Sequence, residues 1–476
     1  MQPSLMGIVV CCCILIVGYR SRNVLVGSLV ASLAFGATAI ATLTFLGNSS
    51  PLIYTFFAAL LVTAVAARRQ VRRELGDAMG SMRPLWVLGG LMLYAIIGAW
   101  LFPRLFAGHA SVFVQSTSRR GVVETALGPV SGNVSQTGYF LLGGLTAIAL
   151  SVLLLRSHGL EQVRRGFILW CSLHAGMGLL DLLGKLSGAG DLLSPIRTAS
   201  YAMLTNASEG GFARIAGAYS EASAFGGVSL ACLAFTFTYW RKTGARYAKW
   251  LSATLLLLII LSTSSTAYVG LAILAVPVSI SLVQATISSR LGPDDFAIVG
   301  VLAAMVVVGL AIHLLDPGFF DPFSRLIEST VINKGTSASG VERTYWNTKS
   351  LQAFSDTGGL GVGMGSSRAS SWPIAVLSQL GLLGAAMMTV LLIVVARGTG
   401  GLSAWIDPES DAIVSSVRAC ALAGVIAGSL VSGTADPGMV FFIALAVVSV
   451  SRVQARRNRV LFGPRQSENL YATLWR

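Results

Sequence analysis

Long runs of apolar residues, separated by short polar segments, extend along almost the whole chain. Most runs are roughly 17–25 residues long, which is the length an α-helix needs to cross a bilayer, whereas a membrane β-barrel consists of short strands of alternating polarity. The pattern therefore predicts an all-α polytopic membrane protein with about 12–13 transmembrane helices. The predicted spans are residues 4–18, 24–46, 52–67, 85–105, 138–155, 167–187, 222–240, 251–263, 266–286, 296–315, 372–396, 413–432 and 437–451.

Composition agrees with this fold class and indicates no separate soluble domain. Of the 476 residues, 54% are hydrophobic and 11% are charged, whereas a typical soluble protein has about 25% charged residues. We predict one membrane domain over residues 1–451 and a basic tail over residues 452–476. Three larger loops lie on one side, over residues 104–138, 188–221 and 316–371. The third shows no obvious regular structure, apart from a short amphipathic helix expected at residues 316–330.

The net charge of +14 is unevenly distributed between the two sets of loops. One set, together with the tail, holds 23 of the 34 Lys and Arg residues but nine of the 20 acids, so the whole excess lies on one side. Because positive residues stay on the cytoplasmic side, we predict a cytoplasmic C-terminus and an outer N-terminus. The charge therefore indicates topology, and no nucleic-acid binding is expected.

All six cysteines fall in predicted spans, so no disulfide is expected in an outer loop.

The second outer loop and the span after it carry two candidate residues, Arg214 and Glu221, within EGGFARIAGAYSEASAFGG. If this segment enters the membrane as a helix, residues seven apart share one face. An ionisable residue near a span is costly to bury and is a functional candidate for that reason. The alternative is a plain surface ion pair or an interfacial anchor.

The third outer loop combines cations, aromatic residues and glycines directly before the next span. Glycine lets backbone amides approach an anion, and arginine binds phosphate through two hydrogen bonds, so the loop could hold a diphosphate. Aromatic faces and planar amides suit sugar rings. A glycine strip also occurs in ordinary loops, which is the alternative. The candidates are Arg343, Tyr345, Trp346, Asn347, Lys349 and Arg368, with glycines at positions 358, 359, 361, 363 and 365.

Other polar residues near the spans carry weaker signals. Asn133 and Gln136, at the mouth of a span, fit a helix cap or a site for a hydroxylated ligand. Asp181 and Lys185 fit a structural i, i+4 pair or, together with His174, a proton path. No H-E-x-x-H, P-loop or G-x-S-x-G motif occurs, so we predict no metal site, no cofactor and neither ATPase nor hydrolase activity.

Several segments follow one another in a familiar order. They are NVSQTGYF at 133–140, ARIAGAYSEASAFGG at 213–227, LSTSSTAYVGLAI at 261–273, and RTYWNTKSLQAF, GVGMGSSRASS and LSQLGLLG between residues 343 and 384. From about Gly121 to the last span, the chain resembles the O-antigen polymerase and ligase superfamily. Within it, the chain looks most like the polymerases of exopolysaccharides and capsular polysaccharides.

The resemblance implies a C-type membrane glycosyltransferase fold in the bacterial inner membrane, with the N-terminus and an outward-facing cavity on the periplasmic side. It implies undecaprenyl-diphosphate-linked oligosaccharides as donors, and a chain-length regulator is a common partner in such pathways. Functional arginines of these polymerases lie in the third and fifth outer loops, where the predicted topology places Arg214 and Arg343. These two would neutralise the leaving diphosphate, and Glu221 is the candidate base that takes the acceptor's proton.

The remaining candidates would bind substrate, with Arg368 as a third cation. Two departures from the family pattern are visible: an R-x10-G spacing places Phe225 and Phe354 where glycine is common, and SSRASSW lacks the histidine of ligases. The alternatives are a ligase that transfers glycan to a lipid core or a protein, and a transporter or flippase. A transporter would have broken spans in paired halves and charges at the midplane.

Overall fold

The computed structural model describes residues 2–44, 47–115, 122–156, 159–201, 203–205, 208–209, 212–288, 292, 295–296, 299–300 and 338–462. Within these ranges the protein is mostly helical. The α-helices are α1 Leu5–Arg20, α2 Val26–Ser32, α3 Ile53–Ala66, α4 Val71–Ser81, α5 Arg83–Leu105, α6 Ser131–Arg156, α7 Leu160–Leu186, α8 Ala222–Thr243, α9 Arg246–Leu261, α10 Ser265–Ile287, α13 Ala338–Asp356, α14 Trp372–Arg397, α15 Pro408–Val431 and α16 Met439–Phe462. Two 3-10 helices are η2 Ser194–Ile196 and η4 Gly400–Trp405.

Short strands connect the helices at a few places. In the described part of the chain they form three two-stranded antiparallel sheets, β1–β2, β3–β4 and β5–β6. The longest is the β3–β4 hairpin, in which Ser111 pairs with Ala126 and Gln115 with Val122. The strands are β1 Gln2–Pro3, β2 Ala41–Thr42, β3 Ser111–Gln115, β4 Val122–Ala126, β5 Ser208–Glu209 and β6 Phe212–Ala213.

Eight of the described helices are long and apolar enough to cross a membrane, and two shorter apolar helices accompany them. The protein is therefore a multi-pass membrane protein of the all-α class, as the apolar runs predict. The predicted and observed helices coincide closely at several spans, for example at residues 85–105 and 372–396. The predicted span at 296–315 and the predicted interfacial helix at 316–330 lie almost wholly outside the described residues.

The prediction of a span over residues 24–46 is wrong. Helix α2 ends at Ser32, and the chain then runs in turns and bridges to β2. Its backbone groups are paired across the fold: Ala37 N–H donates to the Ala218 carbonyl at 2.9 Å, and the Thr38 carbonyl accepts from Ile53 N–H at 3.0 Å. Non-helical backbone is stable at membrane depth only when protein partners satisfy it, and these partners come from the start of α3 and from the segment before α8.

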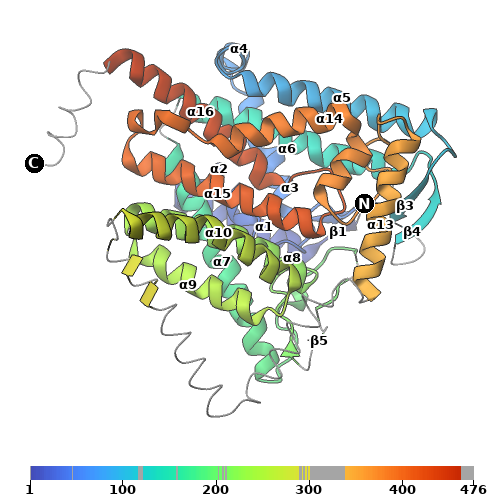
Figure 1. Ribbon diagram of the computed structural model, residues 1–476, viewed down its shortest axis with the longest axis horizontal. Helices are drawn as coiled ribbons and strands as arrows, with labels where there is room; N and C mark the ends of the chain where they lie inside the picture. The colour runs from blue at the N-terminus through green and yellow to red at the C-terminus, as the bar shows by residue number, and fades with distance from the viewer. Residues whose placement is uncertain are drawn as a thin grey trace, which may run out of the picture.

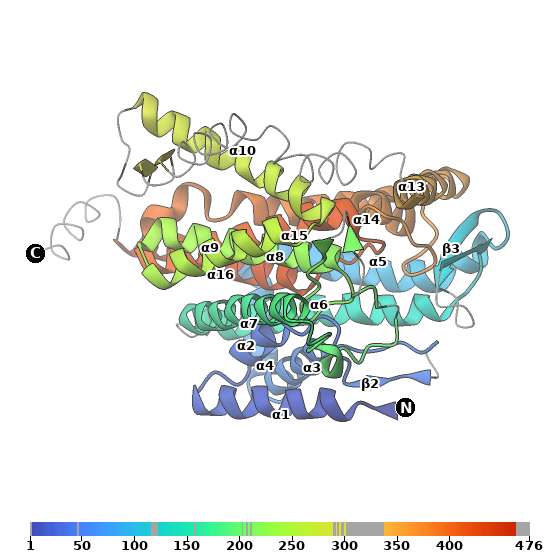
Figure 2. The ribbon, with the colours of Figure 1, turned by 90° about the horizontal axis from the view of Figure 1, so that it is seen from below.

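The helices lie side by side along the long axis of the molecule (Figures 1 and 2). Strand β1, helix α13 and the β3–β4 hairpin are at one end, and the last described turn of α16, at Phe462, is at the other. Helix α16 lies in the centre and α10 at the periphery, because 78% of the apolar window of α16 is buried against 17% for α10. The end that carries the hairpin and α13 is called the hairpin end below.

Small residues allow the central helices to approach closely. Phe442 of α16 packs against Phe140 of α6 with ring centroids 5.6 Å apart. A Cβ at Gly143 would lie 2.4 Å from the Phe442 ring, so only glycine fits there. Such packing of small residues is typical of membrane helices.

Two tryptophans of α5 point away from the bundle. Trp86 and Trp100 are 64% and 65% exposed and lie near the two ends of the helix, where interfacial aromatic residues are enriched.

Two of the predicted outer loops contain more regular structure than expected. The loop over residues 104–138 holds the β3–β4 hairpin, and α6 begins at Ser131, before the predicted span start at 138. The loop over 316–371 holds helix α13. Helix α13 packs against α14 and β3, so the first and third predicted loops meet at the hairpin end.

Candidate functional site

A cavity of about 730 Å³ opens at the hairpin end of the bundle. Hydroxyl and amide groups dominate its polar lining, and Arg368 is the one charged side chain among the described residues that line it. The wall comes from segments that are far apart in the sequence. Lining residues include Asn48, Ser49, Ser50, Tyr54, Phe113, Ser131, Ser135, Gln136, Tyr139, Ser200, Tyr201, Gly365, Ser367, Arg368, Gln379 and Thr434.

Arg368 extends into this cavity. Its side chain is exposed to solvent, yet the surrounding protein lowers the pKa of the guanidinium, and the carboxylate of Glu221 acts in the opposite direction. The side chain crosses Gly433, where an added Cβ would meet its Cγ at 2.6 Å. Among the described residues, no acceptor forms a hydrogen bond or ion pair with Arg368. A guanidinium group without a protein acceptor can form two parallel hydrogen bonds to an anion such as a phosphate.

The glycine segment, residues 358–365, is held in place by a break in α14. Gly381 has a φ of +62° and interrupts the helix, so Leu382 N–H donates to the Gly359 carbonyl at 2.9 Å. The carbonyls of Ser378 and Gln379 accept instead from Val362 N–H at 2.8 Å and Gly363 N–H at 3.1 Å. The bonds that the kinked helix loses are thus replaced by bonds to the glycine segment.

The predicted phosphate cradle of glycine amides is therefore not formed. Besides Val362 and Gly363, the N–H of Gly361 donates to Thr357 Oγ1 at 3.2 Å, and that of Gly365 to Gln379 Oε1 at 3.1 Å. These amides serve the fold, because they are already bonded to protein acceptors. The glycine segment therefore holds Arg368 in place, and the Arg368 side chain, not the glycine amides, is available to a ligand in the cavity.

Asn133 and Gln379 are the two buried amides that fix this segment. Asn133 Oδ1 accepts from Val130 N–H at 2.9 Å, and its Nδ2 donates to the Met364 carbonyl and to Ser366 Oγ. Gln379 Nε2 donates to the Ser367 carbonyl at 2.9 Å. Asn133 thus joins the start of α6 to the glycine segment, which fits the capping hypothesis, whereas Gln136 lines the cavity itself.

We expect Gly365→Ala to lower the free energy of unfolding by more than about 2 kcal/mol. Gly365 has a φ of +78°, and an added Cβ would lie 2.2 Å from the Gly132 carbonyl oxygen, which is backbone and cannot rotate away. Gly358→Ala is the matched control, since its φ is +60° but no atom lies within 4 Å of the added Cβ. Thermal unfolding in detergent measures the stability of both variants. If both lose the same stability, the contact between the added Cβ at Gly365 and the Gly132 carbonyl is not the cause.

The residues predicted on α13 meet the hairpin. Tyr345 donates to Glu124 Oε2 at 2.9 Å, and Lys349 Nζ lies 4.0 Å from Glu124 Oε1. Hydrogen bonds from Ser111 and Tyr345, with the charge of Lys349, hold the pKa of Glu124 below its usual range. The rings of Tyr345 and Trp346 pack on Phe113, which itself lines the cavity.

Asn347 and Arg343 lie on the same helix in different settings. Asn347 Oδ1 accepts from Ser370 N–H at 2.8 Å, so it links α13 to the segment that carries Arg368. Arg343 is half-buried and has no hydrogen bond or ion pair to any described residue. It is not among the residues that line the cavity. Of the α13 candidates, Tyr345, Trp346, Asn347 and Lys349 therefore contact the cavity wall or its supports, and Arg343 does not.

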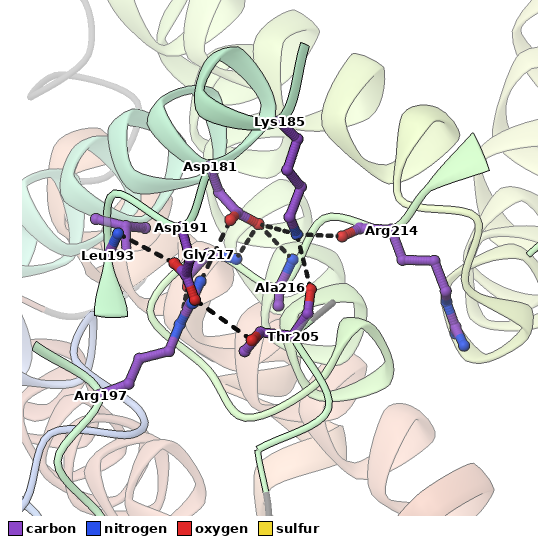
Figure 3. A network of polar contacts seen from close by, with 9 residues as sticks. All are labelled: Asp181, Lys185, Asp191, Leu193, Arg197, Thr205, Arg214, Ala216 and Gly217. Carbon is purple, nitrogen blue, oxygen red and sulfur yellow. Dashed lines mark hydrogen bonds and ion pairs between the residues drawn. The ribbon is translucent and has the colours of Figure 1, made fainter. Parts of the chain in front are cut away.

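A buried ionic network fixes the segment that follows α7 (Figure 3). Asp181, with a fully buried carboxylate, accepts from Lys185 Nζ at 3.0 Å, Ala216 N–H at 2.8 Å and Gly217 N–H at 3.1 Å, and pairs with Arg197. Lys185 also donates to the carbonyls of Thr205 and Arg214. These contacts fit the structural hypothesis for Asp181 and Lys185. No sequence motif singles out Arg197, although it completes the network.

The expectation that Arg214 and Glu221 share a helix face is wrong. Helix α8 begins at Ala222 with Glu221 as its N-cap residue, and residues 214–221 are not helical. The carbonyl of Arg214 faces Lys185, while its side chain extends away from the network (Figure 3). The charge of Arg214 acts on Tyr268 of α10. Glu221 accepts a hydrogen bond from Ser223 and acts electrostatically on Arg368. Glu221 is thus near the cavity cation, and Arg214 does not line the cavity.

Asp436, in the turn between α15 and α16, is an acid that the sequence did not suggest. Burial raises its pKa to about 6, although Gly438 N–H donates to its Oδ1 at 2.8 Å. It acts electrostatically on Tyr54 in the cavity wall, and Thr434, two residues earlier, also lines the cavity. A carboxyl with this pKa beside a polar cavity is suited to proton transfer near neutral pH. Its position in a turn between two spans, next to the proline of TADPG, is the signal that the sequence offers.

No group of three or more potential metal ligands occurs in the part of the chain that the structure describes. Comparison with family models finds no match for the chain, and comparison with curated proteins finds none either. The assignment of a function rests on the cavity and its residues.

Proposed function

We propose that this protein is a membrane polysaccharide polymerase with a C-type glycosyltransferase fold. It would transfer undecaprenyl-diphosphate-linked oligosaccharide units to a growing chain on the periplasmic face of the inner membrane. The observation that carries the proposal is Arg368, a cation without a protein acceptor among the described residues, in a cavity otherwise lined by uncharged groups. Hydroxyl and amide groups suit a saccharide, and an unpaired arginine suits its diphosphate.

The distribution of charge supports an outward-facing cavity. The opposite end of the bundle carries the basic segment before α4, the end of α8 and the end of α16. Positive residues remain on the cytoplasmic side, so the hairpin end would face the periplasm, together with the N-terminus. The polyprenyl tail would lie along the exposed apolar faces of α5 and α14, where Leu93, Ile97, Leu382 and Leu383 are accessible.

The proposed reaction is a single displacement. An acceptor hydroxyl oxygen forms a bond to the anomeric carbon, and the bond from that carbon to the diphosphate oxygen breaks, which inverts the anomeric centre. The electron pair leaves with the diphosphate, and Arg368 stabilises the charge that develops there. The hydroxyl proton passes to a carboxylate. Among the described residues, the candidates for this carboxylate are Glu221, which acts electrostatically on Arg368, and Asp436, which acts on Tyr54.

Arg214 and Arg343 remain proposed catalytic residues on the strength of the family resemblance. Arg343 is on α13, which contacts the cavity wall through Phe113. Tyr345, Trp346, Asn347 and Lys349 would shape the saccharide site from the same side, and Gln136 would contact the sugar directly. Asn133 would act by holding the glycine segment.

The pH dependence distinguishes the two acids. If Asp436 accepts the proton, the transfer rate rises as pH increases through about 6, because the carboxylate form is the base and its pKa is raised to about that value. Asp436→Asn is then expected to lower the rate roughly 10²-fold or more and to abolish this rise. Initial rates from pH 4.5 to 8 measure it. If the rise persists in Asp436→Asn and disappears in Glu221→Gln, Glu221 is the base.

Deletion of the gene, with complementation by the wild-type chain, tests the class of function. Loss of long polymer with accumulation of single lipid-linked repeat units would support polymerisation. Full-length polymer that is not attached to its final acceptor would indicate a ligase. Lipid-linked units retained on the cytoplasmic face would indicate a flippase.

A further inference from the structure

Four arginines come together at the end of the bundle opposite the cavity. Arg397 is the last residue of α14, Arg418 lies in α15, and Arg452 and Arg456 lie one turn apart in α16. These four residues are called the arginine cluster below. The three helices pack against one another, and Figure 1 places α14, α15 and α16 side by side. The cluster takes no part in the proposed reaction.

The cluster converges on one backbone group, the end of α14 at Gly398. Arg452 Nε donates to the Gly398 carbonyl. From the other side, a Cβ at Gly398 would meet Arg418 Cδ at 2.9 Å and its Nη1 and Nε at 3.3 and 3.4 Å. Arg452 is close enough to experience the charges of Arg456, Arg397 and Arg418. Like charges gathered in this way repel one another unless an anion lies between them.

Within the described residues, no acid pairs with any member of the cluster. The three acids at the start of α15 are used elsewhere. Asp407 caps α15 through Ser410 N–H, Glu409 accepts from Tyr239 at 2.6 Å, and Asp411 pairs with Lys242. Arg164, a half-buried arginine of α7 at this same end, pairs with both Glu161 and Glu409. The arginine cluster therefore differs from Arg164 at the same end of the bundle, because its members have no acidic partner among the described residues.

Arg418 supplies a further sign of a missing partner. Its Nε is buried and has no hydrogen-bond acceptor, and a buried donor left without an acceptor is costly. We propose that the arginine cluster binds a phosphate group at the cytoplasmic surface, either the headgroup of an anionic lipid or a free phosphate. Guanidinium groups match phosphate oxygens through paired hydrogen bonds, and the site lies where anionic headgroups meet the protein.

The test uses the full-length protein in detergent and measures its melting temperature and bound lipid by native mass spectrometry. Phosphatidylglycerol, cardiolipin, phosphatidylcholine and inorganic pyrophosphate are added separately. We expect the anionic probes to stabilise the wild type and phosphatidylcholine to have no effect. Stabilisation by lipid alone identifies a headgroup site, and stabilisation by pyrophosphate as well identifies a free-phosphate site.

Arg418→Gln and Arg452→Gln are expected to weaken binding of the probe by at least about tenfold, since each removes a hydrogen bond to a charged group. Arg457→Gln and Arg459→Gln, on exposed residues of the same helix, change the net charge equally and are expected to retain binding. If the variants of the half-buried Arg418 and Arg452 do not fold, the exposed Arg397→Gln and Arg456→Gln give the same comparison. Equal losses in cluster and control variants, or no stabilisation of the wild type, would overturn the proposal.

Discussion

Arg368→Gln is expected to lower the rate of glycan transfer by roughly 10²- to 10³-fold, the usual loss when one group that stabilises developing charge is removed. Arg368 is the one charged side chain in the described wall of the cavity, so no neighbour in that wall replaces it. Glutamine retains hydrogen-bonding capacity and most of the volume but carries no charge. The rate is measured with equal concentrations of the purified proteins and a lipid-linked repeat unit.

Two further variants make this result specific. Arg368→Lys keeps the charge and loses the planar fork, so we expect partial recovery. Arg104→Gln is the matched control, because Arg104 is an exposed arginine at the hairpin end of α5 that lies outside the cavity lining. It is expected to have wild-type rates. Wild-type rates in Arg368→Gln would remove this residue from the mechanism.

Asp181→Ala is expected to have the largest effect on stability, lowering the free energy of unfolding by about 3–5 kcal/mol. The substitution leaves Lys185 and Arg197 without their shared carboxylate, and the amides of Ala216 and Gly217 lose their acceptor. Unfolding in mixed detergent micelles measures the loss. The segment that this network fixes, between α7 and α8, also contains Arg214 and Glu221. The rate of glycan transfer should therefore fall at temperatures where the variant is partly unfolded.

Asp77→Asn is the control for this experiment. Asp77 pairs with Arg156 at 3.5 Å, but both side chains are exposed. An exposed ion pair contributes about 0–1 kcal/mol, so this variant should remain close to wild type. If both variants lower the free energy of unfolding equally, burial does not determine how much the Asp181 network contributes to stability.

Hydropathy predicted the membrane helices well where a single apolar run forms a single helix, as at α5 and α14. It failed at residues 24–46, where the composition is equally apolar. There the backbone bonds to Ala218, which lies far away in the sequence, and to Ile53, the first residue of α3. Apolar composition indicates that a segment is buried, but it does not indicate which groups satisfy its backbone.

The candidate site was predictable in its residue types and less so in its geometry. Arg368 and Gln136 lie in the cavity wall, as substrate-binding residues would. The role of the glycine segment depended on the interruption of α14 at Gly381, because that break supplies the carbonyls that bind the segment's amides. The turn next to Pro437 makes Asp436 visible in the sequence as an acid between two spans, but the raised pKa of its carboxyl depends on the protein that packs around it.

Polymerisation in a reconstituted system decides whether the cavity around Arg368 joins lipid-linked saccharide units. Purified protein in lipid vesicles is supplied with undecaprenyl-diphosphate-linked repeat units, and the products are sized by mass spectrometry. We expect products longer by whole repeat units, with release of undecaprenyl diphosphate, and almost no such products with Arg368→Gln. Repeat units that cross the bilayer but remain single would contradict it.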